Sequence, residues 1–172
     1  LRESGLLASL SGAAWIARHR ETPTPPPTTR FTVLPSRPGT VGGFPALSPD
    51  GRQMAFTLLE AGSAGALWIH DFGSGEARRL EATDGAEYPF WSPDGRFIAF
   101  FARGELRRIA AGGGAVQTIC PATDARGGTW GAEGDIVFSP NSASGLLRVR
   151  ASGGTPAARS DDGCCRQRSA RR

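Results

Sequence analysis

The chain has 172 residues, which is enough for one domain with a hydrophobic core. All 20 basic residues are arginine, and without lysine the chain can complete neither a phosphate-binding P-loop nor a protein kinase active site. The net charge of +4 comes from the two ends, because residues 31–160 hold 12 arginines and 12 acidic residues. A nucleic-acid-binding domain should carry a basic excess on its fold, so no nucleic-acid partner is expected.

Residues 1–20 are expected to form a short apolar helix. Residues 4–17 carry no charge and, as a helix, would cover about 20 Å of the ~30 Å hydrocarbon core of a membrane. Three interpretations stay open: what remains of a membrane span, a signal-peptide-like stretch, and an ordinary buried helix. Trp15 with the arginines after it favours an interfacial anchor, although the positive-inside rule would place this flank in the cytoplasm.

Residues 21–30 are predicted to be a linker. Four prolines in this stretch favour extended polyproline II structure and exclude a helix or a central strand. Such a linker would hold a folded domain away from whatever precedes it. A tail without any spacing role fits the composition equally well.

A tetrapeptide repeat begins after the linker. Ser48-Pro49-Asp50-Gly51 recurs 44 positions later as Ser92-Pro93-Asp94-Gly95, and a weaker copy, Gly-Ala-Glu-Gly, ends 39 positions after that at Gly134. Periods near 40 with strand-like flanks are typical of β-propeller blades. Within each copy we expect a tight turn, in which proline fixes φ, glycine accepts a positive φ and aspartate bonds to the local backbone.

Four short strands per period are predicted, as in propeller blades. In the first blade we expect strands at Pro45–Leu47, Gln53–Leu59, Ala66–Phe72 and Ala77–Ala82. In the second blade they fall at Phe97–Ala102, Glu105–Ala110 and Val116–Cys120, and in the third at Ile136–Ser139, Leu146–Ala151 and Pro156–Arg159. The predicted fold is therefore all-β: a partial propeller of about three four-stranded antiparallel blades over residues 31–160.

The residues that could carry chemistry fit structural roles better. Trp68, Trp91 and Trp130 are expected at equivalent strand positions, packed between blades. His70 has no second histidine within the repeats, and the Gly-x-Ser-x-Gly motif of serine hydrolases is absent. Cys120 fits a small buried hydrophobic residue. We therefore expect no catalytic residue, no metal ligand and no cofactor in this chain.

The repeats resemble the WD40-like PD40 repeat. That repeat builds the propellers of TolB-type periplasmic proteins and of prolyl-oligopeptidase-type peptidases. The Pro-rich linker, then Arg30–Pro35, Tyr88–Ser92 and Gly127–Trp130, is an order similar to the C-terminal region of bacterial membrane-anchored serine/threonine kinases. The resemblance covers residues 30–158. It implies a membrane-anchored protein with an extracytoplasmic propeller, although the orientation stays open.

Two classes of function follow from this resemblance. The first is a binding or sensory propeller that takes a protein or a small ligand on its end surface, where the blade loops converge. The second is the propeller portion of a peptidase, or of a TolB-like interaction protein. In both cases the chain itself would be non-catalytic.

The end of the chain departs from the repeat. Residues 161–172 have no strand periodicity and are predicted to be a disordered basic tail, either native or the product of a shifted reading frame. Propellers close with four to eight blades, so about three blades would form an open arc. We expect both terminal faces of such an arc to be apolar and uncovered, with aromatic residues such as Phe56 and Trp68 poorly shielded.

Overall fold

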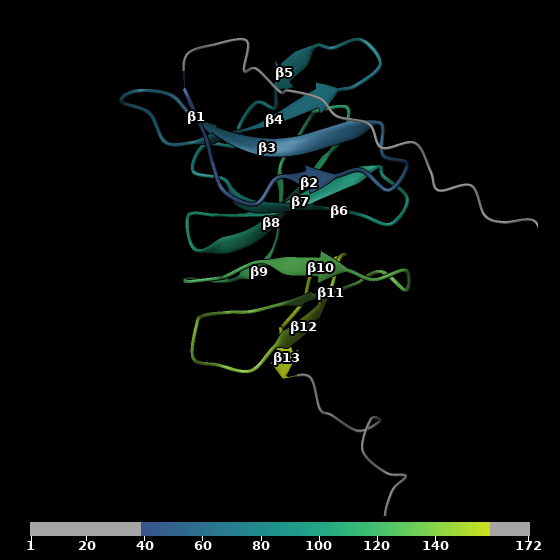
Figure 1. The fold of residues 1–172 in the computed structure, drawn as a ribbon. Coiled ribbons are helices and arrows are strands. Elements are labelled where there is room, and N and C mark those ends of the chain that lie inside the picture. The colour runs from purple at the N-terminus through teal and green to yellow at the C-terminus, as the bar shows by residue number, and fades with distance from the viewer. Residues whose placement is uncertain (1–38, 159–172) are drawn as a thin grey trace, which may run out of the picture. The chain divides into compact units, whose positions relative to one another are not determined.

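The computed structural model describes residues 39–158. They form thirteen strands in three antiparallel sheets, with no helix among the described residues. Figure 1 shows the three sheets stacked in chain order, and each sheet corresponds to one sequence repeat. The predicted all-β propeller-blade fold is confirmed. The apolar segment 4–17, the linker 21–30 and the tail 161–172 lie outside the described residues.

The first sheet has an interrupted inner strand. Its members are β1 (Thr40–Val41), β2 (Ala46–Leu47), β3 (Gln53–Leu59), β4 (Ala66–Asp71) and β5 (Ala77–Arg79). Both β1 and β2 pair with β3, one with each of its halves. The sequence predicted a single inner strand of three residues here, so the strand at Thr40–Val41 was missed. The outer strand was predicted three residues too long, because the backbone turns into a positive φ at Ala82.

The second and third sheets each have four strands in simple order. The second contains β6 (Glu87–Trp91), β7 (Phe97–Ala102), β8 (Glu105–Ala110) and β9 (Gln117–Pro121). The third contains β10 (Gly128–Trp130), β11 (Asp135–Phe138), β12 (Leu147–Arg150) and β13 (Ala157–Ala158). The alternation of apolar residues along these strands gives each sheet two faces that can pack against neighbours.

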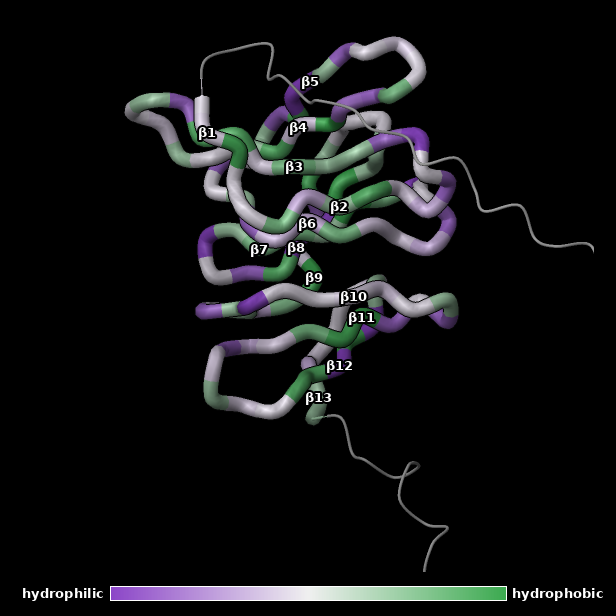
Figure 2. The backbone as a smooth tube through the Cα atoms, in the orientation of Figure 1, coloured by the Kyte–Doolittle hydropathy of each residue, from purple (hydrophilic) through white to green (hydrophobic). Residues whose placement is uncertain are grey.

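Apolar side chains fill both spaces between the sheets. Between the first and second sheets, Leu67 and Ile69 of β4 pack with Ile98 and Phe100 of β7. Figure 2 shows that many of the loops at the ends of the strands are hydrophilic, as is the outer strand β5. The sheets are therefore held face to face by hydrophobic burial, which stabilises by about 25 cal/mol per Å² of apolar surface.

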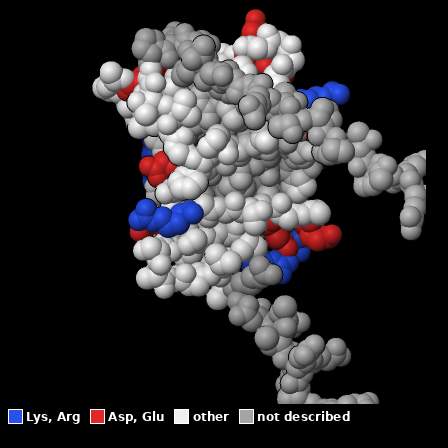
Figure 3. Space-filling model, viewed as in Figure 1, with Lys and Arg blue, Asp and Glu red and all other residues white. Residues whose placement is uncertain are grey.

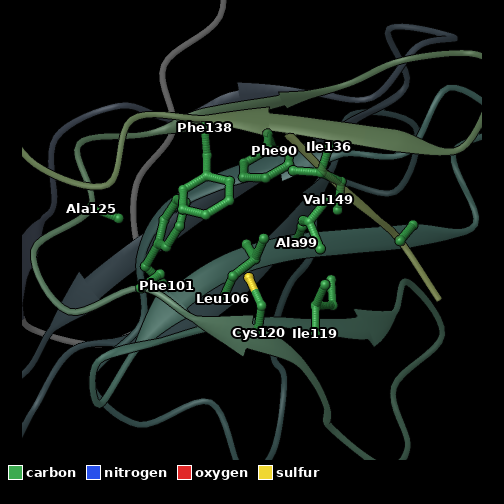
Figure 4. Close-up of a cluster of buried hydrophobic side chains, with 12 residues drawn as sticks. Phe90, Ala99, Phe101, Leu106, Ile119, Cys120, Ala125, Ile136, Phe138 and Val149 are labelled. Atoms are coloured by element: carbon green, nitrogen blue, oxygen red, sulfur yellow. The ribbon is translucent and has the colours of Figure 1, made fainter. Parts of the chain in front are cut away.

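The second and third sheets share a larger cluster. Figure 4 shows Phe138, Ile136 and Val149 of the third sheet pointing toward Phe101 and Leu106 of the second. Four of these five side chains are under 4% exposed. Cys120 lies in the same cluster, and burial raises the pKa of its thiol to about 11. The prediction that Cys120 is a buried hydrophobic residue agrees with this placement.

The two outward faces of this stack differ from the expectation. On the first sheet, Phe56 and Trp68 are 0% and 6% exposed, so neither is poorly shielded. On the third sheet the outward face is polar rather than apolar. There Asp135 receives the guanidinium groups of both Arg148 and Arg150 and is 12% exposed, whereas the two arginines are more than half exposed. The expectation of two bare apolar faces is wrong.

Candidate functional site

The Ser-Pro-Asp-Gly copies form turns that are held by their own side chains. The Ser48 hydroxyl donates to Oδ1 of Asp50 at 2.6 Å and accepts the backbone N–H of Gln53 at 2.9 Å. The same carboxylate oxygen accepts the N–H of Arg52 at 3.0 Å, and Gly51 has a φ of 69°. These bonds, the Ser48 bond first, lower the pKa of Asp50. The Asp50 carboxylate therefore makes its hydrogen bonds within the turn.

The second turn repeats the first one contact for contact. The Ser92 hydroxyl donates to Asp94 at 2.6 Å and accepts the N–H of Phe97 at 2.9 Å, and Gly95 has a φ of 70°. Hydrogen bonding from Ser92 likewise lowers the pKa of Asp94. Pro49 and Pro93 occupy the second position of each turn, where a fixed φ is favourable. Both copies therefore have a structural role, joining the inner strand of a blade to the next strand.

The three tryptophans do not form one set. Trp91 and Trp130 occupy matching inner-strand positions, and each packs against the preceding sheet. The Trp91 indole donates to the carbonyl oxygen of Ala46 at 2.9 Å, and the Trp130 ring stacks on Phe97 with centroids 6.3 Å apart. Trp68 lies on β4 instead, and its buried Nε1 has no hydrogen-bond partner in the part of the chain described. The predicted equivalence is right for two of the three.

A different feature recurs at the start of every inner strand. Phe44 and Tyr88, which each precede a proline, have φ values of 65° and 50°. Gly127 takes the same place in the third repeat, with a φ of 107°. Positive φ costs an L-residue about 1–2 kcal/mol, and a following proline restricts the backbone further. Strain of this kind persists only where the surrounding structure imposes it, and it clusters at functional sites.

The strain belongs to bulges in the inner strands. In the second sheet, Glu87 faces Phe101 and Phe90 faces Ala99, so two residues of β6 oppose one residue of β7. In the first sheet, the four residues 42–45 oppose two residues of β3. Bulges of this type change the direction in which a side chain points. Here they bring the rings of Phe44 and Tyr88 together, with centroids 5.0 Å apart and planes inclined by 38°.

These two rings line a cavity of about 520 Å³. Its wall contains Phe44 from the first sheet, Tyr88 from the second, and Arg126 from the segment that leads into the third. Glu87 also borders the cavity, and Phe44 is 68% exposed, unusually high for an aromatic side chain. The volume lies within the range of roughly 300–1,000 Å³ that ligand pockets occupy. We call this cavity the inner-strand pocket.

Hydrogen bonds between the first two sheets fix one side of the inner-strand pocket. The hydroxyl of Thr57 on β3 donates to the carbonyl oxygen of Ala86 at 3.1 Å, in a buried position. The carbonyl oxygen of Gly65 accepts the N–H of Gly85 at 2.7 Å. All four residues line the pocket. Buried bonds of this kind hold the wall in place, which suits a preformed binding site.

Arg126 connects the pocket to the third repeat. Its pKa is raised above the ordinary value, first by a side-chain hydrogen bond with Tyr88 and then by the charge of Asp124. The Asp124 carboxylate lies 3.0 Å from Nη2 of Arg126, and both side chains are more than half exposed. Such an exposed ion pair contributes little stability. Its main effect is to hold the guanidinium group beside the Tyr88 hydroxyl.

The side chains of the pocket are of the kinds that make binding contacts. The pocket combines aromatic surface, one guanidinium group and one carboxylate, with no pairing of a nucleophile and a base. Within residues 39–158 there is no cluster of three or more histidine, cysteine, aspartate or glutamate side chains that could hold a metal ion. A second hollow of about 620 Å³ is the open outward face of the third sheet, around Asp135.

Sequence reasoning did not find the inner-strand pocket. The aromatic-proline pair before each Ser-Pro-Asp-Gly copy was visible as part of the repeat, but it was read as scaffold. Its positive φ could not be predicted, because a residue before proline usually adopts an extended conformation. Arg126 lies outside both full repeat copies, so nothing in the spacing pointed to it. The recurrence of Phe44 and Tyr88 at one repeat position was the signal available.

Comparison with known proteins identifies the fold. TolB from Acinetobacter baumannii superposes with a TM-score of 0.55 at 24% identity, over 67% of this chain and 31% of that one. The putative TolB from Agrobacterium tumefaciens gives a TM-score of 0.57 at 21% identity, over 73% and 50%. The β-propeller domain of the Trilobed protease from Pyrococcus furiosus gives 0.53 at 17% identity, over 66% and 40%. The chain thus has a β-propeller fold and spans half or less of these proteins.

Sequence similarity to a known protein covers a shorter part of the chain than the structural similarity does. A stretch of 55 residues is 46% identical to part of the uncharacterized peptidase YuxL of Bacillus subtilis (strain 168). That stretch is 31% of this chain but only 8% of the peptidase. No family model matches the sequence. Among the described residues, none forms a helix long and apolar enough to cross a membrane.

Proposed function

We propose that this chain is a non-catalytic binding module, a set of propeller blades that recognises a protein or peptide ligand through the inner-strand pocket. One observation carries the proposal. Two consecutive repeats hold an aromatic residue at positive φ, and both rings meet in a cavity whose wall is completed by Arg126. The inner-strand bulges impose this strain, and a binding site gains an aromatic surface with a set direction from it.

The placement of the pocket supports this role. Its three side chains Phe44, Tyr88 and Arg126 come from three successive repeats, so a ligand would contact all of them at once. Phe44 and Arg126 lie just before inner strands and Tyr88 lies near the start of one, at the end of these strands that is opposite the Ser-Pro-Asp-Gly turns. Loops carried on a rigid sheet are the usual location of binding residues. Figure 3 shows that charged side chains lie toward the sides of the face in view, leaving uncharged atoms between them.

A peptide-display selection on the full chain tests the proposal. Selected peptides are expected to bind Phe44→Ala and Arg126→Ala at least tenfold more weakly than the parent chain. Leu47→Ala is the matched control, because Leu47 is a 57% exposed apolar residue of the adjacent strand that does not line the pocket. The proposal fails if the selected peptides bind Phe44→Ala as well as they bind the parent.

A second candidate is that the blades belong to a peptidase. The 46% identity to part of the peptidase YuxL favours it, as does the fold likeness to the propeller domain of a protease. In that case the propeller would act beside a hydrolase domain outside this chain, and the pocket would contact the peptide substrate. A Gly-x-Ser-x-Gly motif in the flanking gene sequence would distinguish this candidate from a sensory module.

The cellular setting is part of the proposal. We place the module outside the cytoplasm, as in the TolB-type proteins that the repeats resemble, with residues 4–17 as its membrane anchor. The kinase-like order of linker and repeats stays a prediction, and an upstream His-Arg-Asp catalytic loop in the same gene would support it. Separation of membrane and soluble fractions, with and without residues 1–20, tests the anchor.

A further inference from the structure

We infer that the ligand of the inner-strand pocket is a proline-rich segment in polyproline II conformation, supplied by a partner protein. This inference rests on the proposed function and adds the chemical class of the ligand. It follows from three properties of the pocket: its exposed aromatic rings, its excess of hydrogen-bond donors, and its nearly balanced charge. Each property is argued from the side chains that line the cavity.

The aromatic rings provide an apolar ridge that is already in place. Phe44 is 68% exposed yet packed against Tyr88 at a centroid distance of 5.0 Å, and its backbone is locked at a φ of 65°. Because the ring is fixed before the ligand arrives, little conformational entropy is lost on binding. Proline rings pack onto such aromatic ridges, and the polyproline II helix is itself preformed.

The polar groups of the pocket are mainly donors. Arginine has no acceptor atom, so the Tyr88 oxygen beside the Arg126 guanidinium group can only accept from it. That leaves the Tyr88 O–H free to donate to a ligand, together with the remaining N–H groups of Arg126. Proline-rich backbone is the complementary ligand, because each proline offers a carbonyl acceptor and no N–H.

The charges favour an uncharged ligand. Arg126 pairs with Asp124 at 3.0 Å but stays more than half exposed, and Glu87 lies at the border of the pocket, so a ligand faces charges of both signs. An acidic peptide would meet Glu87, and a basic peptide would meet Arg126. A segment of prolines and small neutral residues has no charge that Glu87 or Arg126 could repel. Discrimination against both charge types is therefore expected from the pocket itself.

The direct test uses fluorescein-labelled hexaproline and the full chain, followed by fluorescence anisotropy. Saturable binding is expected, with hexaalanine of equal length failing to compete, because it lacks the proline rings that pack on Phe44 and Tyr88. Phe44→Ala should weaken binding at least tenfold. Tyr88→Phe keeps the ring and removes only the O–H, so a loss of about threefold to tenfold is expected. Leu47→Ala should bind like the parent.

Three results would overturn the inference: no saturable binding of hexaproline, equal competition by hexaalanine, or unchanged binding by both Phe44→Ala and Tyr88→Phe. Because Tyr88→Phe keeps the ring of this half-buried residue and removes only the hydroxyl, loss of folding is not expected to explain its effect, and a urea melt of each variant checks this. If display-selected peptides depend on Phe44 while hexaproline does not bind, the proline-rich class is wrong and the binding function stands. If neither depends on Phe44, both fail.

Discussion

The strained backbone at Phe44 leads to a stability order that reverses the usual one. Glycine within a strand is normally less stable than alanine by about 0.5–1 kcal/mol. The backbone at Phe44 has a φ of 65°, which costs an alanine placed there about 1–2 kcal/mol and costs a glycine almost nothing. Subtracting the extra entropy cost of glycine leaves Phe44→Gly more stable than Phe44→Ala by about 1 kcal/mol. Both variants lose the same ring, so the contact with Tyr88 cancels in the comparison.

Urea unfolding of the two full-length variants measures this difference. With a slope of about 2 kcal/mol per molar urea, a 1 kcal/mol difference moves the midpoint by about 0.5 M. The control is Ala46→Gly in neighbouring β2, which should lower stability relative to the parent chain. If Phe44→Ala unfolds at the same urea concentration as Phe44→Gly, or at a higher one, then Phe44 is not strained and the main support for the pocket is lost.

Three further outcomes are expected. Thr83 is 1% exposed, and its hydroxyl donates to the carbonyl oxygen of Leu80 at 2.6 Å and accepts the N–H of Leu67 at 3.0 Å. Thr83→Val should therefore lower the free energy of unfolding by about 2–4 kcal/mol in urea melts, and Thr83→Ser should lower it much less. Equal losses for the two variants would contradict this. The pKa of Asp94 is lowered in the folded state, so the carboxylate contributes stability above pH 3.8 that is lost as the pH falls through the folded-state pKa. Asp94→Asn should therefore weaken the dependence of the unfolding free energy on pH in the acid range. An unchanged pH dependence would refute the role of Ser92. Burial raises the pKa of the Cys120 thiol to about 11 from an ordinary 9.0, which implies roughly hundredfold less thiolate at a given pH. Iodoacetamide at pH 8 should therefore modify Cys120 only after the protein unfolds, and the mass of the peptide that contains Cys120 measures this.

The parts of this fold that could be predicted from sequence are those fixed by local chemistry. The bounds of the strands at Gln53–Leu59, Phe97–Ala102 and Glu105–Ala110 match the prediction, because alternating apolar residues between turn signals leave one register. The Ser-Pro-Asp-Gly turns are equally local. The two-residue strand Thr40–Val41 has no such pattern and exists only because β3 offers it a partner.

The inner-strand pocket could not be predicted from the sequence, because it depends on contacts between repeats. Its three residues lie 44 and 38 positions apart, at Phe44, Tyr88 and Arg126, and only the stacking of the sheets brings them together. The direction of each ring depends on a bulge, and a bulge is set by the register of two strands rather than by the residue itself. Periodicity could therefore predict the blades but not the cavity at their inner edge.

The charged outward face of the third sheet has a consequence for how copies of this chain meet. Where the second sheet offers Ala99 and Phe101 to its neighbour, the third offers Asp135, Arg148 and Arg150. Stacking an apolar sheet of another molecule there would strip water from these ions, at a cost of several kcal/mol for each. A head-to-tail contact that repeats without closing would build a fibre, and this face opposes the first step of such growth.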